Sequence, residues 1–240
     1  MPKSRTDQPA DRDNQRGEDD AEDRASPGRR GRPLGFDRDA ALQIALRLFR
    51  LHGYDGVGIA ELTDAMGIRA PSLYAAFGNK QGLYEAAVAA YVAQNATWMS
   101  AALDNAPSIA DGVRTLLRHA AVGYANGAGP GAVDAELCGC DREPVSDDEP
   151  RGCMVLNSTR TARDEDVRAV TFGPRNAVRV FLRQRMEAVD AARADELADY
   201  VAMALHGLSA MAADSVSLAR LKACAEAAAD GFENLVKKGE

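Results

Sequence analysis

The sequence predicts an all-α protein, and three observations support that fold class. Alanine and leucine dominate the composition and runs of β-branched residues are few, as is typical of helical proteins. Apolar residues recur at intervals of three and four, the period of an amphipathic helix. Capping residues such as Asp, Asn and Gly stand where these periodic segments begin and end. The 240 residues, 46% of them hydrophobic, suffice for one medium domain or two small ones.

The composition also indicates the cellular compartment in which the protein is expected. No run approaches about 18 uncharged apolar residues, so we expect no membrane span. The N-terminus is highly charged and lacks the apolar segment of a secretory signal. We therefore expect a cytoplasmic protein, whose four cysteines are reduced thiols rather than a disulfide framework.

Charge is distributed unevenly along the chain. The net charge is −7, yet residues 29–80 hold eight basic and five acidic side chains and so carry +3. Residues 1–28 are charged and nearly free of apolar side chains, which predicts a disordered tail. A basic segment on an acidic remainder indicates an anion-binding head and a separate body. The arm Arg29–Pro33, with Arg30 and Arg32, is either a solvated tail or a contact to phosphate or the minor groove.

The first helix is predicted from Asp37 to Gly53. Asp37 is a suitable N-cap, and Phe36 and Ala41 stand in the positions of a hydrophobic staple. Gly53 is a typical helix end. The apolar stripe of this helix consists of Ala41, Ala45, Leu48 and Phe49.

Three more helices are predicted directly after it. "GIAELTDAMG" (58–67) is a short helix that ends at a glycine, and "APSLYAAF" (70–77) is another, with Pro71 in its first turn. Asn79 can cap a fourth helix, which we expect to run from Lys80 to about residue 104.

Two short helices joined by a glycine-containing turn are typical of a helix-turn-helix, whose second helix enters the major groove of DNA. The outward face of that helix must be slim, and Ala70, Ala75 and Ala76 satisfy this need. Hydrogen-bonding groups for bases or phosphates come from Arg69, Ser72 and Tyr74. The amides that open the next helix, together with Lys80, suit a backbone phosphate. The alternative is a helix-turn-helix that serves packing only.

The segments "GIAELTDAMGI", "APSLYAAF" and "NKQGLYEAAV", with Gly53-Tyr54, together resemble the DNA-binding domain of TetR-family transcriptional regulators. The match covers about Phe36 to Tyr91. The resemblance implies an all-helical homodimer, usually a repressor, which binds a near-palindromic operator and whose C-terminal domain binds a small molecule.

The resemblance also implies where DNA is contacted. Gly58 matches a position where Thr or Ser commonly touches phosphate, and Ala76 replaces a larger polar residue, so we expect Arg69 and the N-terminal arm to carry more of the recognition. The predicted DNA-binding residues are Arg69, Ala70, Pro71, Ser72, Tyr74, Ala76, Lys80, Gly58, Arg30 and Arg32.

The rest of the chain is predicted to be helical too, with one long loop over residues 126–150 and a kink or break possible at Gly173-Pro174. "PRGCMVLNS" and "ADYVAMALHGLSAMAADS" resemble the branch of the family grouped with its acrylate-responsive regulator. The fold of the family implies that helices at about 194–212 and 217–236 form a four-helix bundle with their copies in a homodimer. We therefore expect three parts: the tail 1–28, a DNA-binding domain 29–82, and an effector-binding and dimerisation domain 83–240.

An effector pocket is expected between the fourth helix and those that follow it. Each candidate for its wall could equally be a core residue, His119 included. The candidates are Trp98, His119, Tyr124, Asn157 and Phe181.

The cysteines suggest a different effector chemistry. Cys138 and Cys140 lie in the long acidic loop, and Cys153 stands at a helix start, where a thiol pKa falls. Such a group could bind a soft metal, react with an electrophile or form a disulfide, or Cys153 could simply pack. Cys224 is expected in the core of the bundle.

The sequence offers little support for an enzyme. It contains no glycine-rich phosphate loop or His-Glu-x-x-His pair, and none of its three histidines stands beside a recognisable nucleophile. No cofactor is predicted. The expected function is that of a repressor that a small-molecule effector releases from DNA, by moving the fourth helix and changing the spacing of the two heads. The alternatives are a thiol or metal sensor on the same fold, and a helical interaction module without specific DNA binding.

Overall fold

The computed structural model describes residues 36–127, 129–132, 149–158 and 163–238. Every element in these ranges is helical, which confirms the all-α prediction. The arm with Arg30 and Arg32, and the loop positions Cys138 and Cys140, lie outside the described residues.

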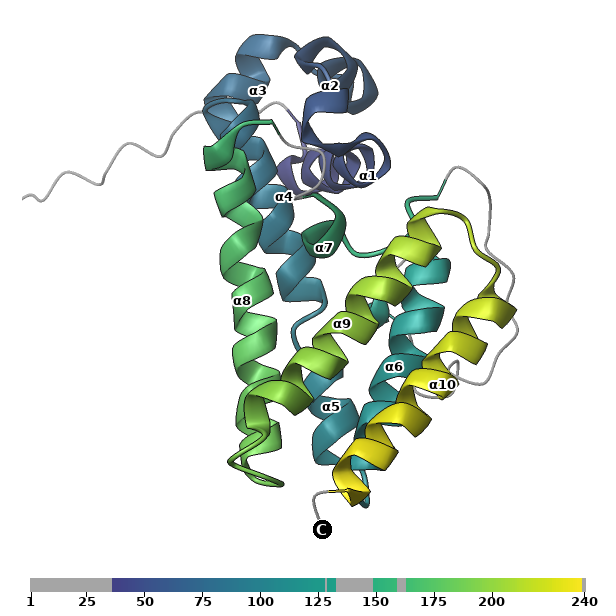
Figure 1. The fold of residues 1–240 in the computed structure, drawn as a ribbon. Helices are drawn as coiled ribbons and strands as arrows, with labels where there is room; N and C mark the ends of the chain where they lie inside the picture. Colours follow the sequence, from purple (N-terminus) through teal and green to yellow (C-terminus); the bar gives the residue numbers. More distant parts are fainter. Residues whose placement is uncertain (1–35, 128, 133–148, 159–162, 239–240) are drawn as a thin grey trace, which may run out of the picture. The chain divides into compact units, whose positions relative to one another are not determined.

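The first four helices, which form the head of the molecule, occur in the order that the sequence predicts. The α-helices of the described residues are α1 (Arg38–Gly56), α2 (Ile59–Met66), α3 (Ala70–Phe77), α4 (Lys80–Gln94), α5 (Trp98–Asp104), α6 (Ile109–Ala125), α7 (Met154–Ser158), α8 (Glu165–Glu187), α9 (Ala194–Ala213) and α10 (Leu218–Lys237), and a 3₁₀ turn spans Pro130–Ala132 (Figure 1). Predicted caps form: the Asp37 carboxylate accepts from the backbone of Asp39 and Ala40, and the Asn79 side chain accepts from Gly82. α1 is interrupted at Gly53, where the backbone leaves the helical conformation.

The predicted fourth helix is too long. α4 ends at Gln94, and a short turn separates it from α5. Asn95 explains the break, because its side-chain amide donates to Tyr91 O (2.8 Å) while its side-chain oxygen accepts from Gly131 N (2.8 Å). A contact with the 3₁₀ turn, 36 residues further on, is thus formed at the end of α4, and no local pattern foretells it.

One other expectation also needs correction. The break considered at Gly173-Pro174 does not occur, because α8 continues through Pro174 from Glu165 to Glu187. Cys224 is exposed on α10 within the single chain, so its place in the core of a dimer bundle stays a prediction.

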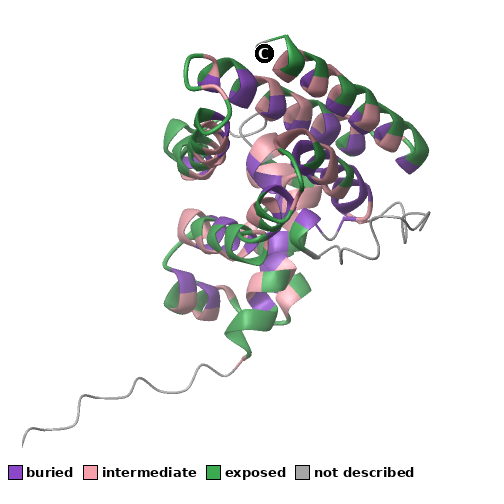
Figure 2. Ribbon diagram, turned by 90° about the horizontal axis from the view of Figure 1, so that it is seen from below, coloured by how far each residue is buried: buried purple, intermediate pink, exposed green. Residues whose placement is uncertain are grey.

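Two hydrophobic clusters divide the described residues. The head cluster contains Phe49, Leu62 and Leu73, and it also takes in Met154 of α7 and Val167 of α8. The body cluster joins α5, α6, α8, α9 and α10. Figure 2 shows buried residues on the sides where helices meet. Because Cys153 packs against both clusters, the α7 region connects head and body.

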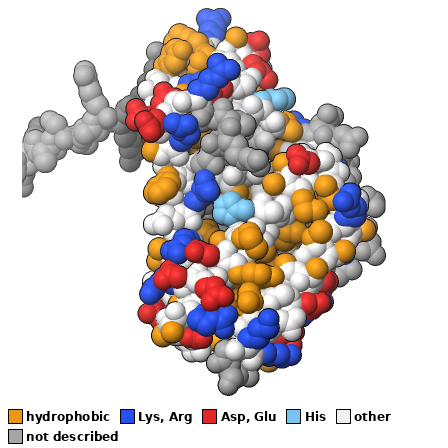
Figure 3. Space-filling model, viewed as in Figure 1, with side chains coloured by type: hydrophobic (Ala, Val, Ile, Leu, Met, Phe, Trp, Pro, Cys, Tyr) orange, Lys and Arg blue, Asp and Glu red, His pale blue; other side chains and the backbone are white. Residues whose placement is uncertain are grey.

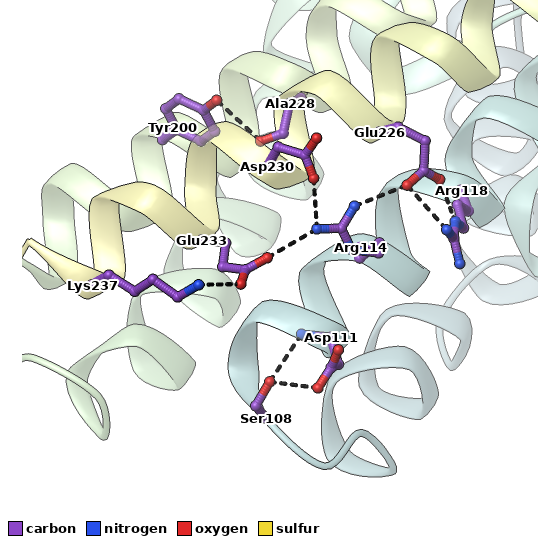
Figure 4. Close-up of polar contacts among 10 residues, drawn as sticks. All are labelled: Ser108, Asp111, Arg114, Arg118, Tyr200, Glu226, Ala228, Asp230, Glu233 and Lys237. Atoms are coloured by element: carbon purple, nitrogen blue, oxygen red, sulfur yellow. Dashed lines mark hydrogen bonds and ion pairs between the residues drawn. The ribbon is translucent and has the colours of Figure 1, made fainter.

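Charged side chains tie α10 to α6 (Figure 4). The Arg114 guanidinium lies 2.9 Å from Glu226, 2.8 Å from Asp230 and 3.1 Å from Glu233. Arg118 binds the same Glu226 carboxylate. These contacts are partly exposed, so each adds little alone, but together they fix how α10 lies along α6.

Candidate DNA-binding face and effector cavity

The α2–α3 turn positions the candidate DNA-binding face. Gly67 adopts a left-handed conformation (φ 65°), which only a residue without Cβ takes up readily, and this sharp turn lets α3 follow α2 after only three residues. The Ile68 amide donates to Thr63 O (3.0 Å), and Leu62 and Leu73 are buried beneath the turn. One face of α3 is thereby anchored and the opposite face is left outward.

The outward face carries most of the predicted contact residues. Tyr74 is 45% exposed, so its ring is not part of the core. Arg69 and Pro71 are exposed as well, while Ser72 is half-buried. These positions agree with the expected face, although their contact with DNA stays a prediction.

Two predicted contact positions, Ala70 and Ala76, are less exposed than the sequence suggests, whereas Gly58 is exposed. Ala70 and Ala76 are half-buried, and Ala76 packs against the head cluster, because it lies one turn from Leu73 on α3. Gly58 is the N-cap of α2 without a side-chain hydrogen bond, and a Cβ there would meet nothing within 4 Å.

Lys80 lies against the head itself. Its ammonium is 4.2 Å from the centre of the Tyr54 ring. Burial lowers the pKa of Lys80, and the nearby Asp55 carboxylate opposes that shift. A phosphate would therefore compete with a cation–π contact for this amine. A similar contact was not foreseen: the Arg38 guanidinium lies 4.7 Å from the ring of Phe77 at the end of α3.

The body contains a cavity of about 660 Å³. Its wall comes from α4, α5, α6, α8 and α9 and from the segment around Cys153. Trp98, Tyr124 and Phe181 line it, as the sequence predicts for an effector pocket. A cavity of this size with a mostly apolar wall suits a small organic molecule.

The other two predicted wall residues do not line this cavity. His119 lies on α6 five residues before Tyr124, about 140° around the helix, and so faces elsewhere. Burial lowers the pKa of His119. Asn157 lines a smaller cavity beside α1, where its side-chain oxygen accepts from the Ser209 hydroxyl (3.1 Å).

Cys153 is half-buried in the wall of the main cavity, next to two tyrosines. Burial raises the pKa of Tyr91 and of Tyr124 well above the ordinary value, and the Cys153 thiol beside both raises it further. Both phenols are therefore neutral hydrogen-bond donors at the cavity wall.

The cavity wall also contains a polar pair, Arg175 and His206, that the sequence did not predict. The Arg175 guanidinium of α8 lies 3.3 Å from His206 Nε2 of α9, and His206 Nδ1 lies 2.6 Å from Ala202 O. Since a carbonyl only accepts, Nδ1 carries the proton and Nε2 accepts from Arg175. The two residues are 31 positions apart, so only the packing of α8 on α9 reveals the pair.

No group of three His, Cys, Asp or Glu side chains that could hold a metal ion occurs in the ranges that the structure describes. Among the same residues, no helix is both long and apolar enough to cross a membrane.

Known proteins match both halves of the chain. Residues 41–87 match the family model of bacterial regulatory proteins of the tetR family. The HTH-type transcriptional repressor ComR of Escherichia coli is 31% identical over 87% of this chain and 94% of its own length. A second repressor of that organism, BdcR, is 28% identical over 87% of this chain and 95% of its own.

A solved structure extends the likeness to three dimensions. A cysteine mutant of the TetR family transcriptional regulator CifR, in complex with 26-bp double-strand operator DNA, is 37% identical. It covers 83% of this chain and 98% of its own, with a TM-score of 0.69. Sequence relatives and this fold agree, and the chain belongs to the TetR family of bacterial transcriptional regulators.

Proposed function

We propose that this protein is a homodimeric repressor that binds a palindromic operator through α2 and α3 and is released by a small organic effector in the body cavity. The observation that carries the proposal is the slim, outward face of α3, on which Tyr74 is exposed, with Arg69 exposed at the start of the helix. The operator-bound CifR structure and the two repressors of E. coli support it. The division into a DNA-binding domain 29–82 and a body 83–240 belongs to this proposal.

The proposed dimer forms through α9 and α10. Figure 3 shows hydrophobic side chains gathered over α9 and its border with α10. Gly207 of α9 and Ala223 and Ala227 of α10 are exposed. Small side chains let helices of two copies approach closely, and such a face would be covered in a four-helix bundle.

The proposed release mechanism uses helices that reach from the cavity to the head. Tyr91 of α4 lines the cavity, and Leu83 and Tyr84 at the start of α4 belong to the head cluster. α8 offers a second connection, because it lines the cavity at Phe181 while the Arg163 amide just before it donates to Asp55 at the end of α1 (2.7 Å). An effector that shifts α4 or α8 would change the spacing of the two heads.

The effector is proposed to be mainly apolar with one or two acceptor atoms. Trp98 and Phe181 supply apolar surface, and the neutral phenol of Tyr124 supplies a donor. Membership of the acrylate-responsive branch is the finer part of the proposal and rests on the sequence resemblance alone.

Binding to the DNA upstream of the gene tests the proposal. We expect the protein to prefer this DNA over a scrambled duplex of equal length, with an affinity that falls steeply as the salt concentration rises. Equal, weak binding to both duplexes would favour the alternative of an interaction module without specific DNA binding.

A thiol sensor is a second candidate, and the place of Cys153 in the cavity wall favours it. Cys138 and Cys140 belong to the same hypothesis but lie outside the described residues. In this version the Cys153 thiolate attacks an electrophile that fills the cavity, and its proton passes to solvent. A Cys153→Ser variant that still binds the upstream DNA but no longer releases it on treatment with N-ethylmaleimide would support the sensor. Equal release of both proteins would exclude Cys153.

A further inference from the structure

Arg50 of α1 is inserted among three backbone carbonyls that belong to the body. Its Nη1 donates to Gly127 O (2.5 Å), and its Nη2 donates to Pro150 O (3.0 Å) and Gly152 O (3.1 Å). The guanidinium also lies 5.3 Å from the centre of the Tyr91 ring. Charge-assisted bonds to three carbonyls on two segments hold α1 to those segments more firmly than a surface ion pair would.

The segment that Arg50 holds forms part of the cavity wall. The Gly152 amide donates to Tyr124 O of α6 (2.9 Å), and the next amide, of Cys153, donates to the Ser209 hydroxyl of α9 (2.9 Å). Gly152 has φ 78°, and a Cβ there would collide with Asn157 and with Ser209. The backbone at Gly152–Cys153 is therefore fixed from three sides, and a molecule that pushes on Cys153 pushes on this segment.

A displacement of Arg50 is transmitted to the head through the packing of α1. Phe49, the preceding residue, is 1% exposed and packs edge-on against Tyr84, with ring centres 5.1 Å apart. Leu46, one turn earlier, is buried in the same cluster as Leu62 of α2 and Leu73 of α3. A helix with such a packed face shifts as a unit, so a displaced Arg50 displaces the base on which α2 and α3 rest.

From these contacts we infer that Arg50 is the residue that couples the Gly152–Cys153 part of the cavity wall to the DNA-binding head. The inference rests on the proposed function and deepens it, because it names the link between cavity and operator affinity. Arg50 acts by position and touches neither DNA nor effector.

The test uses a small covalent probe in place of the unknown effector. Methyl methanethiosulfonate adds a methylthio group to Cys153 as methanesulfinate leaves, and dithiothreitol reverses the reaction. The background protein carries Cys138→Ser, Cys140→Ser and Cys224→Ser, and mass spectrometry verifies complete labelling. Affinity for the upstream DNA is measured before labelling, after it, and after reversal.

We expect labelling to weaken operator binding by at least about fivefold, the lower end of usual allosteric coupling. With Arg50→Met the loss should shrink to less than about twofold, since methionine cannot bond the three carbonyls. The matched control is Arg193→Met, because Arg193 also donates to a backbone carbonyl, Leu235 O (2.9 Å), but at the far end of the body. It should keep the full response to labelling.

Two results would overturn the inference. One is a labelled protein, with Arg50 intact, that binds the operator as well as before; the other is an Arg50→Met variant that responds as strongly as the control. If Arg50→Met does not fold, Arg50→Lys takes its place, since lysine keeps the charge but cannot reach all three carbonyls, and an undiminished response there would equally contradict the coupling. A protein that shows no specific binding even unlabelled would instead contradict the proposed function.

Discussion

The DNA-binding head and the effector cavity differ in how far apart their residues lie in the sequence. The exposed face of α3 consists of neighbours within one short helix. The cavity wall joins Tyr91, Tyr124, Cys153 and His206, which come from four segments of the chain. A site built within one element depends on local signals and on one packed core beneath it. A site built between elements depends on every contact that positions those elements. Substitutions should therefore affect the DNA-binding face and the effector cavity in different ways.

The largest loss of stability and of operator binding is expected from a substitution in the head cluster. Leu73 of α3 is completely buried in the head cluster, so Leu73→Ala should lower the free energy of unfolding by about 3 kcal/mol and abolish operator binding. Urea unfolding and operator titration measure the two effects. The control Leu73→Met keeps the volume and should cost less than about 1.5 kcal/mol. A stable Leu73→Ala protein that still binds the operator would show that this core does not position α3.

The next largest loss of operator affinity is expected from a substitution on the outward face of α3. Arg69→Ala should weaken operator binding by about 1–3 kcal/mol, roughly 5- to 150-fold, because a guanidinium contact to base or phosphate is lost. Its free energy of unfolding should stay within about 0.5 kcal/mol, since the side chain is exposed. Arg183→Ala, on the surface of α8, serves as the control and should leave operator affinity unchanged. Equal affinity of Arg69→Ala and the unaltered protein would remove Arg69 from the interface.

A smaller, pH-dependent effect is expected in the body. Hydrogen bonding from Arg118, with help from Arg114, holds the pKa of Glu226 below its ordinary value. A lowered carboxyl pKa stabilises the fold above the ordinary glutamate pKa of about 4.3, and that stability is lost as the pH falls through the lower folded value. The network is partly exposed, so Arg114→Met should cost less than about 1 kcal/mol at pH 7.

Thermal unfolding at pH 7 and at about pH 3.5 checks this prediction, because the difference between Arg114→Met and the unaltered protein should shrink at the lower pH. A difference that is the same at both values would mean that the contacts of Arg114 with the carboxylates contribute nothing.

The smallest changes in stability and operator affinity are expected from a substitution at the start of α2. Gly58 caps this helix without a side-chain bond and has open space around it, so Gly58→Ser can add a hydroxyl cap. We expect the melting temperature to rise slightly, for a gain of a few tenths of a kcal/mol, and the operator affinity to increase through a new phosphate contact. A serine variant with weaker DNA binding would mean that the start of α2 stands away from the phosphates.

Local signals predicted the head well. The bounds of α2 and α3 follow from Gly58, Gly67 and Pro71, and the Asn79 cap sets the start of α4. The end of α4 was missed because Asn95 bonds to Gly131, which is distant in sequence.

The cavity could be predicted only in part, for the same reason. Trp98, Tyr124 and Phe181 stood out as large aromatic side chains, whereas the pairing of Arg175 with His206 and the contacts of Arg50 exist only after helices have packed. His119 and Asn157 were placed in the pocket by residue type, and the helical rotation of α6 and the bond to Ser209 place them elsewhere.

A DNase I footprint of the protein on the DNA upstream of its gene tests the central claim most directly, because it reports specificity and symmetry together. A homodimer with one α3 per half-site should protect a near-palindromic stretch whose half-site centres lie about one helical turn, roughly 34 Å, or a multiple of it apart. The protection should disappear with Arg69→Ala at the same protein concentration. Uniform coverage without a boundary, or protection that Arg69→Ala leaves unchanged, would contradict an operator-binding repressor that reads DNA through α3.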